Sequence, residues 1–244
     1  MKNLIKKNIP KSILIFLQNL LLFWRLLNYK KPKFFCNVCE NNTYGYLTGF
    51  FPKLTITCNN CLSESKQRLI SQYLKKYDFK NKTVLHFAPE DCMIKFINKN
   101  KIYNKYILAD INPTKEIKKV DITDIQFQNS TFDLIICSHV LEHVDEKKAI
   151  KELKRIIKIN GSILLLFPII DSWDKTYRND NIKNDYDRER HFLQHDHLHL
   201  FGKEIEKELP DDNFSLKKIT PFGEECVKYG INQGESLFVL EKNK

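Results

Sequence analysis

The sequence predicts an α/β protein in which helices cover both faces of a mostly parallel sheet, with a small cysteine-rich segment in front of it. From about residue 62 onward, apolar runs typical of buried strands alternate with amphipathic helical patterns. The apolar runs are nearly continuous, as in parallel sheets that are buried on both faces. A chain of 244 residues is long enough for one such domain and a small appendage.

The expected strands and helices alternate along the body of the chain. Strands are predicted at residues 83–88, 105–111, 117–122, 132–138 and 162–167, and a closing antiparallel hairpin at 215–220 and 236–241. Helices are predicted at residues 62–77, 93–98, 146–159 and 202–209, the third of them capped by Asn160 and Gly161. Residues 168–201 are polar, and we expect them to form a long functional loop at the carboxyl edge of the sheet.

The net charge of +10 is concentrated at the N-terminus. Residues 1–35 contain eight basic side chains and no acidic one, which leaves 32 basic and 30 acidic residues for the rest of the chain. A nucleic-acid enzyme more often carries its basic surface on the folded body. The nearly neutral body therefore disfavours a nucleic-acid partner without excluding one.

The same N-terminal region contains an apolar segment, residues 12–27, with a narrow polar stripe. It is shorter than the about 20 apolar residues of a spanning helix, and such a stripe suits a membrane interface. We expect peripheral contact with the inner face of the membrane and a cytoplasmic protein. Packing against the domain or a partner, and a single span, are the alternatives. A signal peptide is disfavoured because Gln18 and Asn19 interrupt the apolar run and no cleavage site follows.

Four cysteines predict a metal site. Cys36, Cys39, Cys58 and Cys61 form two C-x-x-C pairs separated by 18 residues, and residues 43–57 between them have the pattern of a short hairpin. Two tight turns with two thiolates each suit tetrahedral Zn²⁺ and leave no open coordination position. We therefore expect a structural zinc in a zinc ribbon; four unrelated reduced cysteines are the alternative, which the spacing disfavours.

The order of these motifs resembles the class I S-adenosylmethionine-dependent methyltransferases over about residues 80–241. The strongest segment is residues 131–144, where Phe-Asp opens the fourth strand and His139-Val-Leu-Glu142-His143-Val follows it. The ribbon, the segment LHFAPE at 85–90 and QHDH at 194–197 look like a bacterial subgroup of poorly assigned substrate. The resemblance implies a Rossmann-like, doubly wound, seven-stranded sheet. It divides the chain into an N-terminal helix (1–33), a zinc ribbon (34–62) and a methyltransferase domain (63–244).

The resemblance also implies where S-adenosyl-L-methionine binds. Asp110, followed by Ile111, would accept the ribose hydroxyls, and Asp121, Ile122 and Thr123 would flank the adenine. Ser138 and His139 would line the methionine end. The usual glycine-rich first loop is replaced by His86, Phe87, Ala88, Pro89 and Glu90, where Glu90 or His86 would take over the contact of the missing acid. Plain turn or capping roles are the alternatives for both aspartates.

The candidate catalytic residues are His195, Asp196 and His197, because a histidine paired with a carboxylate is a suitable general base near pH 7. A network that only fixes the loop, and a second metal site, are the alternatives. The expected activity is O-methylation of a sugar, glycan or other small polar acceptor, in envelope glycan biosynthesis. Two other functions stay open: an RNA methyltransferase that uses the ribbon to bind RNA, and a non-catalytic zinc and membrane adaptor that retains the fold.

Overall fold

The computed structural model describes residues 20, 33–48, 54–77, 80–101, 103–113 and 116–243. Apart from Leu20, the predicted N-terminal helix and the expected membrane contact of residues 12–27 lie outside the described residues. Within the described ranges, no helix is long and apolar enough to cross a membrane.

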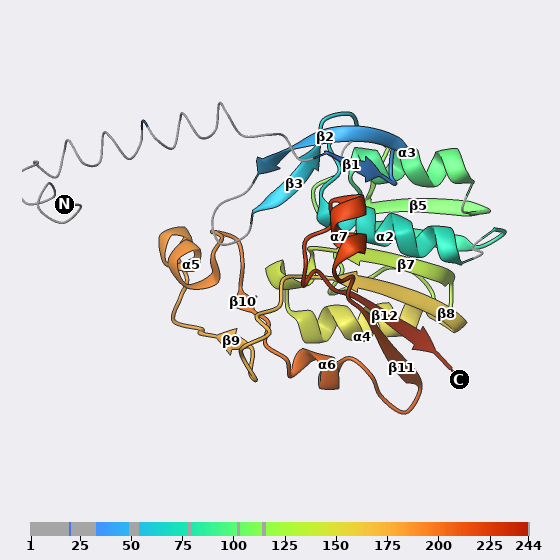
Figure 1. Ribbon diagram of the computed structural model, residues 1–244. Helices are drawn as coiled ribbons and strands as arrows, with labels where there is room; N and C mark the ends of the chain where they lie inside the picture. Colours follow the sequence, from blue (N-terminus) through green and yellow to red (C-terminus); the bar gives the residue numbers. More distant parts are fainter. Residues whose placement is uncertain are drawn as a thin grey trace, which may run out of the picture. The chain divides into compact units, whose positions relative to one another are not determined.

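One seven-stranded sheet forms the centre of the protein, with the strand order β11–β12–β8–β7–β4–β5–β6 (Figure 1). Its strands are β4 (Thr83–Phe87), β5 (Lys105–Asp110), β6 (Lys118–Lys119), β7 (Phe132–Ser138), β8 (Ile157–Leu166), β11 (Phe214–Ile219) and β12 (Leu237–Lys242). The first five run parallel, whereas β12 is antiparallel to both β8 and β11. The mostly parallel sheet and its antiparallel C-terminal pair are therefore confirmed.

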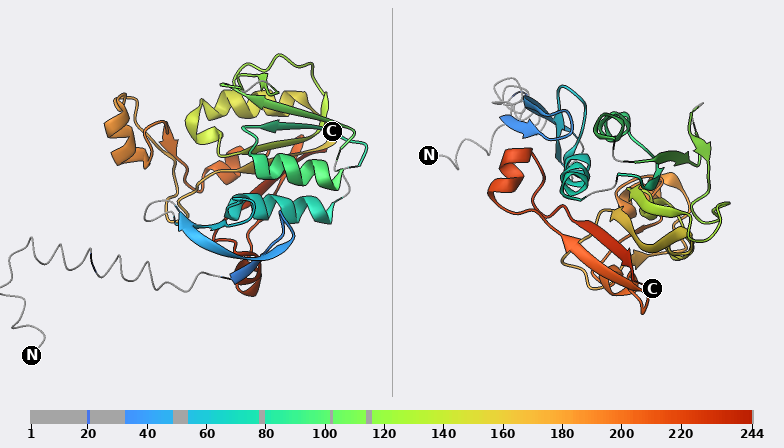
Figure 2. Two further views of the ribbon diagram at one scale, coloured as in Figure 1. Left: turned by 90° about the horizontal axis from the view of Figure 1, so that it is seen from above. Right: turned by 90° about the vertical axis from the view of Figure 1, so that its right-hand side faces the viewer.

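Helices cover both faces of this sheet. The helices α2 (Ser65–Lys76) and α3 (Asp91–Asn100) lie on one side and α4 (Glu146–Ile156) on the other (Figure 2). Side chains that alternate along each strand separate the two cores: Val84 packs with the α2 and α3 side, and Leu85 packs with α4 and α6 (Ile205–Glu208). The doubly wound arrangement explains why the parallel strands are apolar throughout.

The third predicted helix ends earlier than expected. Helix α4 ends at Ile156, and β8 begins at once with Ile157, which pairs with Phe132. Asn160, at φ +60°, turns the chain within β8, and regular pairing with β7 resumes at Ser162. The prediction that Asn160 and Gly161 cap this helix is wrong, because β-branched residues at 156, 157 and 159 fit a strand at least as well as a helix.

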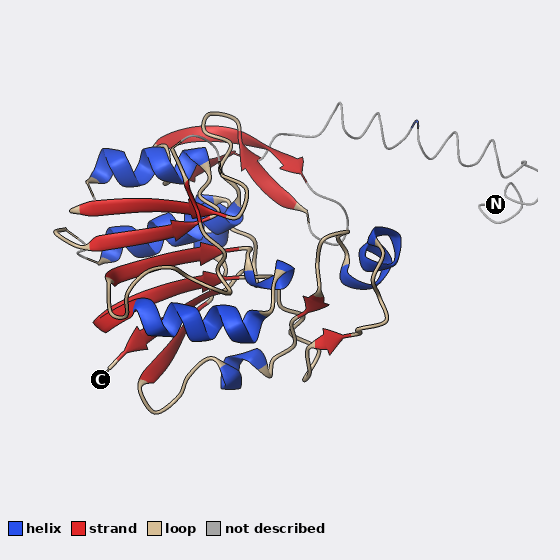
Figure 3. Ribbon diagram, turned by 180° about the vertical axis from the view of Figure 1, so that it is seen from behind, coloured by secondary structure: helices blue, strands red, loops and turns tan. Residues whose placement is uncertain are grey.

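Three further segments differ from the predicted elements. The third strand is reduced to two residues, Lys118–Lys119. The polar segment 168–201 is not a plain loop, because it contains α5 (Asp185–Phe192) and a small antiparallel sheet of β9 (Tyr177–Arg178) and β10 (His199–Leu200). This polar lobe stands apart from the main sheet (Figure 3). Helix α7 (Glu224–Tyr229) comes between the two C-terminal strands in the sequence, and it was not predicted.

The cysteine-rich segment forms a separate antiparallel sheet of β1 (Lys33–Cys36), β2 (Asn41–Thr48) and β3 (Thr55–Cys58). Its side chains belong to the core on the α2 and α3 side of the main sheet, so the ribbon has no separate core. Phe34 is central to this contact: a Cβ on Gly45 would lie 2.8 Å from its ring, and one on Gly230 would lie 2.9 Å away. The chain division at residues 33/34 and 62/63 remains a prediction.

Arg68 of α2 links the ribbon to the rest of the domain. Its side chain is fully buried, and its guanidinium donates hydrogen bonds to the carbonyls of Ser63, Ile56 (2.5 Å) and Gly230 (2.6 Å). The guanidinium also lies 4.7 Å from the centre of the Phe34 ring. One side chain therefore holds β3, the turn before α2 and the end of α7 together.

Replacing Arg68 by methionine should destabilise the protein by about 3 kcal/mol, because two buried carbonyls and one partly buried carbonyl lose their donors while the apolar stem is kept. Chemical denaturation of the full-length protein measures this loss. Arg190→Met is the matched control, because Arg190 is 59% exposed, pairs with Asp187 at 3.5 Å and lies over the ring of the exposed Tyr186. It should cost less than about 0.5 kcal/mol. Equal losses for the two variants would contradict the linking role of Arg68.

Candidate functional site

Two carboxylates lie at the ends of neighbouring parallel strands. Asp110 ends β5, and its residue pairs with Lys119 of β6. The amide of Val120 donates to the carbonyl of Asp110 at 2.9 Å, so Asp121 follows one residue beyond this contact. The structure therefore brings Asp110 and Asp121 to the same edge of the sheet, as the sequence predicted for both.

The surroundings of the two aspartates differ. The carboxylate of Asp110 is half-buried and accepts one hydrogen bond, from the amide of Asn112 at 2.8 Å. The carboxylate of Asp121 is exposed and accepts from both the hydroxyl and the amide of Thr123, which lowers the pKa of Asp121. A carboxylate can accept two ribose hydroxyls, which is how acids after a strand read ribose in dinucleotide folds.

The apolar residues that follow these two aspartates, Ile111 and Ile122, differ in exposure. Ile111 is 52% exposed directly after Asp110, so it offers apolar surface at the edge of the sheet. Ile122 is buried in the core beneath α4. Its packing fixes the backbone that presents Asp121 and Thr123, and its side chain does not reach the edge.

The first loop has the left-handed backbone conformation that glycine favours, although it contains no glycine. Ala88, directly after β4, has φ +46°, and its amide donates to the carbonyl of Ala109 at 2.9 Å. His139, directly after β7, has φ +54°. Left-handed backbone costs a residue with a side chain about 1 kcal/mol or more, and such strain is found at functional sites. The two residues flank the point between β4 and β7 where the strand order reverses, which is the usual ligand site of an open α/β sheet.

Two other residues of the first loop point into the protein interior. His86 is fully buried, its Nδ1 lies 2.7 Å from the hydroxyl of Tyr106, and burial lowers its pKa to about 3. Phe87 is buried on the opposite face, among the residues beneath α4. Glu90 is half-buried immediately before α3 and accepts a hydrogen bond from Gln67 at 2.7 Å. Of the predicted first-loop side chains, Glu90 is therefore the polar group closest to the sheet edge.

Ser138 and His139 end β7 beside this loop. Ser138 is buried, and its hydroxyl has no hydrogen-bond partner within the described part of the chain. The Nδ1 of His139 lies 3.1 Å from Oε1 of Glu142 in the short helix η2 (Leu141–His143). Glu142 is buried; burial opposes its ionisation, but the neighbouring His139 and His143 and a backbone hydrogen bond together outweigh burial and hold the pKa of Glu142 below its usual value.

The three predicted catalytic residues do not form one constellation with each other. His195 is exposed, the carboxylate of Asp196 lies 3.3 Å from Nδ1 of His143, and Nδ1 of His197 lies 2.9 Å from the carbonyl of Phe192. The amide of Leu198 donates to the carbonyl of Glu142 at 2.9 Å. The polar lobe is therefore attached to η2, and its histidines meet those of the segment after β7.

No role in the site was predicted for Glu142 and Glu146, which belong to this cluster together with His143 and His199. The signal was present locally, because Glu142 and His143 follow His139 at spacings of three and four residues. Their partners come from residues 178–199, far along the chain. Glu146 is bound by Arg178 at 2.5 Å, and Nδ1 of His199 lies 3.8 Å from the same carboxylate.

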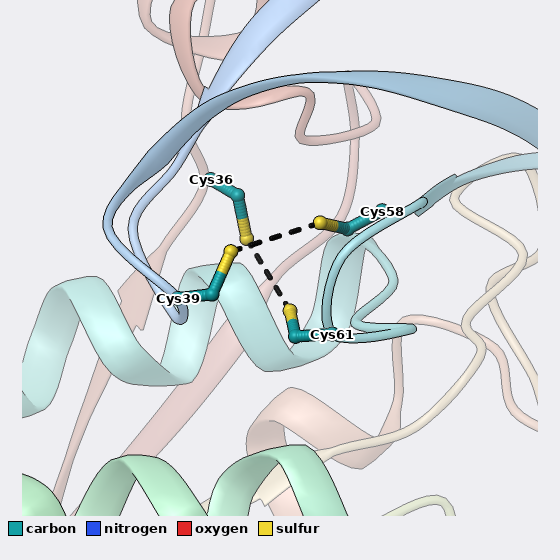
Figure 4. Close-up of side chains that lie close together, drawn as sticks. All are labelled: Cys36, Cys39, Cys58 and Cys61. Atoms are coloured by element: carbon teal, nitrogen blue, oxygen red, sulfur yellow. Dashed lines mark hydrogen bonds between the residues drawn. The ribbon is translucent and has the colours of Figure 1, made fainter.

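The four predicted metal ligands converge (Figure 4). The sulfur atoms of Cys36 and Cys61 are 3.7 Å apart, and those of Cys39 and Cys58 are 3.8 Å apart. Sulfur atoms bound to one tetrahedral Zn²⁺ at about 2.3 Å lie about 3.8 Å from each other. The cluster therefore has the dimensions of a four-cysteine zinc site.

The surroundings of the cysteines also fit a charged metal cluster. Zn²⁺ with four thiolates carries a net charge of about −2. The charges of Cys36 and Cys58 act on the buried guanidinium of Arg68, whose pKa burial lowers and these charges raise. Each turn ends in a left-handed residue, Glu40 and Leu62, whose amides donate to the carbonyls of Cys36 and Cys58. The residues present can hold zinc, and the arginine balances one of the two negative charges.

The second cysteine turn borders the first loop. A pocket of about 500 Å³ lies between residues 60–62 of the ribbon and residues 90–92 at the start of α3. Its lining includes Lys66, Gln67 and Lys95. The ribbon therefore reaches the same edge of the sheet as the candidate cofactor residues.

Comparisons with known proteins agree with this architecture. Residues 68–165 match the family model described as a methyltransferase domain. An uncharacterized protein of Methanocaldococcus jannaschii is 32% identical over 146 residues, which are 56% of this chain and 61% of that protein. The alignment thus spans about three fifths of the length of that relative.

Solved structures of methyltransferases are similar to this chain at low sequence identity. An S-adenosylmethionine-dependent methyltransferase from Mesorhizobium loti has a TM-score of 0.50 and 10% identity, covering 70% of this chain and 95% of its own. A SAM-dependent methyltransferase from Archaeoglobus fulgidus has a TM-score of 0.44 and 15% identity, covering 72% of this chain and 94% of its own. The family match covers less than half of the chain, from α2 to β8, and includes the strand ends with Asp110 and Asp121; this part of the chain is therefore similar to a methyltransferase domain.

Proposed function

We propose that this protein transfers the methyl group of S-adenosyl-L-methionine to a hydroxyl of a sugar or another small polar acceptor. The observation that carries the proposal is the pair of carboxylates, Asp110 and Asp121, at the ends of adjacent parallel strands beside the strand-order reversal. The methyltransferase family match supports the donor, and the polar lobe supports the acceptor class.

In this proposal, Asp110 accepts the ribose hydroxyls, and Ile111 lies against the adenosine. Asp121 and Thr123 flank the adenine, with Ile122 supporting them from the core. Ala88, Glu90, Ser138 and His139 surround the methionine end, where the left-handed backbone of Ala88 and His139 brings main-chain groups close. His86 and Phe87 act through packing beneath this loop.

When bound, S-adenosylmethionine supplies an electrophilic methyl group on a positively charged sulfur. The acceptor oxygen forms a bond to the methyl carbon while the carbon–sulfur bond breaks, and the hydroxyl proton passes to a base. The protein contributes by aligning the oxygen with that bond and by excluding water. The proposed acceptor-side residues remain His195, Asp196 and His197. The acceptor approaches this group at His195, which is exposed.

The polar lobe offers a surface suited to a hydroxylated acceptor. Tyr186 of α5 is 71% exposed, and Trp173 before β9 is 39% exposed. Exposed aromatic faces stack on the apolar faces of sugar rings, while polar side chains around them pair with hydroxyls. The charged residues of α5, such as Asp187 and Arg190, provide that second kind of group.

Several finer parts of the proposal rest on the sequence. They are the assignment to the bacterial subgroup, the role in envelope glycan biosynthesis, the cytoplasmic location and the peripheral membrane contact of residues 12–27. The zinc of Cys36, Cys39, Cys58 and Cys61 is proposed to be structural, because four thiolates leave no coordination position open.

Replacing Asp110 by asparagine should weaken S-adenosylmethionine binding by about 10- to 100-fold, since a hydrogen bond to a charged group contributes about 1.5–3 kcal/mol. Isothermal titration calorimetry measures the Kd. Asp124→Asn is the matched control, because Asp124 is an exposed aspartate in the segment after β6, and it should leave the Kd unchanged. Unchanged binding by the Asp110 variant would contradict the ribose contact.

The acceptor class is tested by the release of S-adenosylhomocysteine with monosaccharides, nucleotide sugars and RNA oligonucleotides as acceptors. We expect release with a sugar acceptor, and none with RNA. Release with RNA alone would replace this proposal with the RNA methyltransferase. An absence of both cofactor binding and turnover would leave the adaptor function.

Replacing Cys58 by serine should remove the ribbon zinc and lower the free energy of unfolding by at least about 3 kcal/mol, because binding of a structural zinc contributes directly to folding. Elemental analysis and chemical denaturation measure the two effects. Cys226→Ser is the control, since Cys226 is also buried but lies outside the cluster. Equal zinc contents of the two variants would rule out the four-cysteine site.

A further inference from the structure

The segment after β7 and the end of the polar lobe form a second group of metal-binding side chains. Glu142, His143 and His197 each have one potential ligand atom, and these atoms lie within 4.8 Å of one another. The hydrogen bond from the amide of Leu198 to the carbonyl of Glu142 holds the two segments in place. The group combines residues that are more than 50 positions apart in the chain.

Within the described residues, the charged group that pairs with Glu142 is an imidazole, that of His139 at 3.1 Å, and not an arginine or a lysine. Its side chain is 1% exposed, and neither carboxylate oxygen has a hydrogen-bond partner of good geometry within the described ranges. A buried carboxylate is costly unless it is paired or binds a metal. Glu146, four residues later, shows the contrast: it is also buried, and Arg178 binds it at 2.5 Å.

The two imidazoles are held as metal ligands usually are. Nδ1 of His197 donates to the carbonyl of Phe192 at 2.9 Å, and Nδ1 of His143 lies 3.3 Å from the carboxylate of Asp196. A proton held on Nδ1 leaves the lone pair on Nε2. Metal-binding histidines typically donate their other nitrogen to a carbonyl or a carboxylate in this way.

We propose that Glu142, His143 and His197 bind a divalent transition-metal ion at a site separate from the four-cysteine cluster. Two imidazoles and one carboxylate suit Zn²⁺, Fe²⁺ or Co²⁺, whereas Mg²⁺ and Ca²⁺ prefer all-oxygen ligands. Three protein ligands leave at least one position open to water or another oxygen, as in catalytic rather than structural metal sites. This inference goes beyond the proposed function and does not depend on the acceptor.

The test uses the full-length protein without affinity-tag histidines, stripped with a chelator and dialysed against Zn²⁺. Elemental analysis should find two zinc ions per chain. Glu142→Gln keeps the side-chain shape but removes the charge, and it should lower the affinity for the second ion at least about tenfold. His195→Ala is the matched control, because His195 is exposed in the same segment and should leave two ions bound.

A second measurement needs no variant. Titration of the stripped protein with Co²⁺ should give one equivalent with sulfur-to-cobalt charge-transfer absorption, and a further equivalent with only the weaker bands of nitrogen and oxygen ligands. A single equivalent with sulfur ligands only would overturn the proposal. Two ions retained by the Glu142→Gln variant with unchanged affinity would also overturn it, and would leave a hydrogen-bonded histidine–glutamate network. S-adenosylmethionine binding, measured separately, reports on the proposed function.

Discussion

The buried guanidinium of Arg68 is the interaction on which the N-terminal half of the structure depends. It donates to carbonyls from three segments and stacks over Phe34, yet none of its hydrogen-bond acceptors is a carboxylate. A buried cation needs a negative charge nearby, and the four cysteines, once they bind zinc, provide it. Arg68 and a zinc ion bound by these cysteines would therefore stabilise each other. This reciprocity explains why a ribbon too small to have its own core is joined to the domain.

The same contact determines the position of the candidate site. The second cysteine turn leads directly into α2, and α2 runs antiparallel to β4, so its N-terminus lies at the carboxyl edge of the sheet. There Gln67 donates to Glu90 of the first loop. The ribbon thus supports, from outside, a loop that lacks the usual glycines. Ala88 keeps the left-handed backbone because the hydrogen bond to Ala109 and the start of α3 restrain both of its sides.

Local patterns were sufficient for most of the fold and for the cysteine cluster, and insufficient where two segments must meet. Apolar runs located β4, β5 and β7, and C-x-x-C spacing located all four metal-ligand candidates. The start of β8 was missed because residues 156–159 fit a helix and a strand equally well. Asp110 and Asp121 could be placed by the rule that parallel strands end at one edge. Glu142 could not, because its importance comes from its burial and from His197, which is 55 residues later.

The two buried acids of the segment after β7 show how charge balance connects the polar lobe to the sheet. Arg178 of β9 neutralises Glu146, and β9 pairs with β10, so this ion pair fixes the lobe on one side. Glu142 faces His139 and His143 of its own segment and His197 of the lobe, so on this side the lobe supplies one imidazole instead of a second arginine. An arginine beside Glu142 would have formed a second ion pair with a purely structural role. Imidazoles and the Glu142 carboxylate can instead bind one metal ion together. Such an ion would have a coordination position open for a further ligand beside the end of β7.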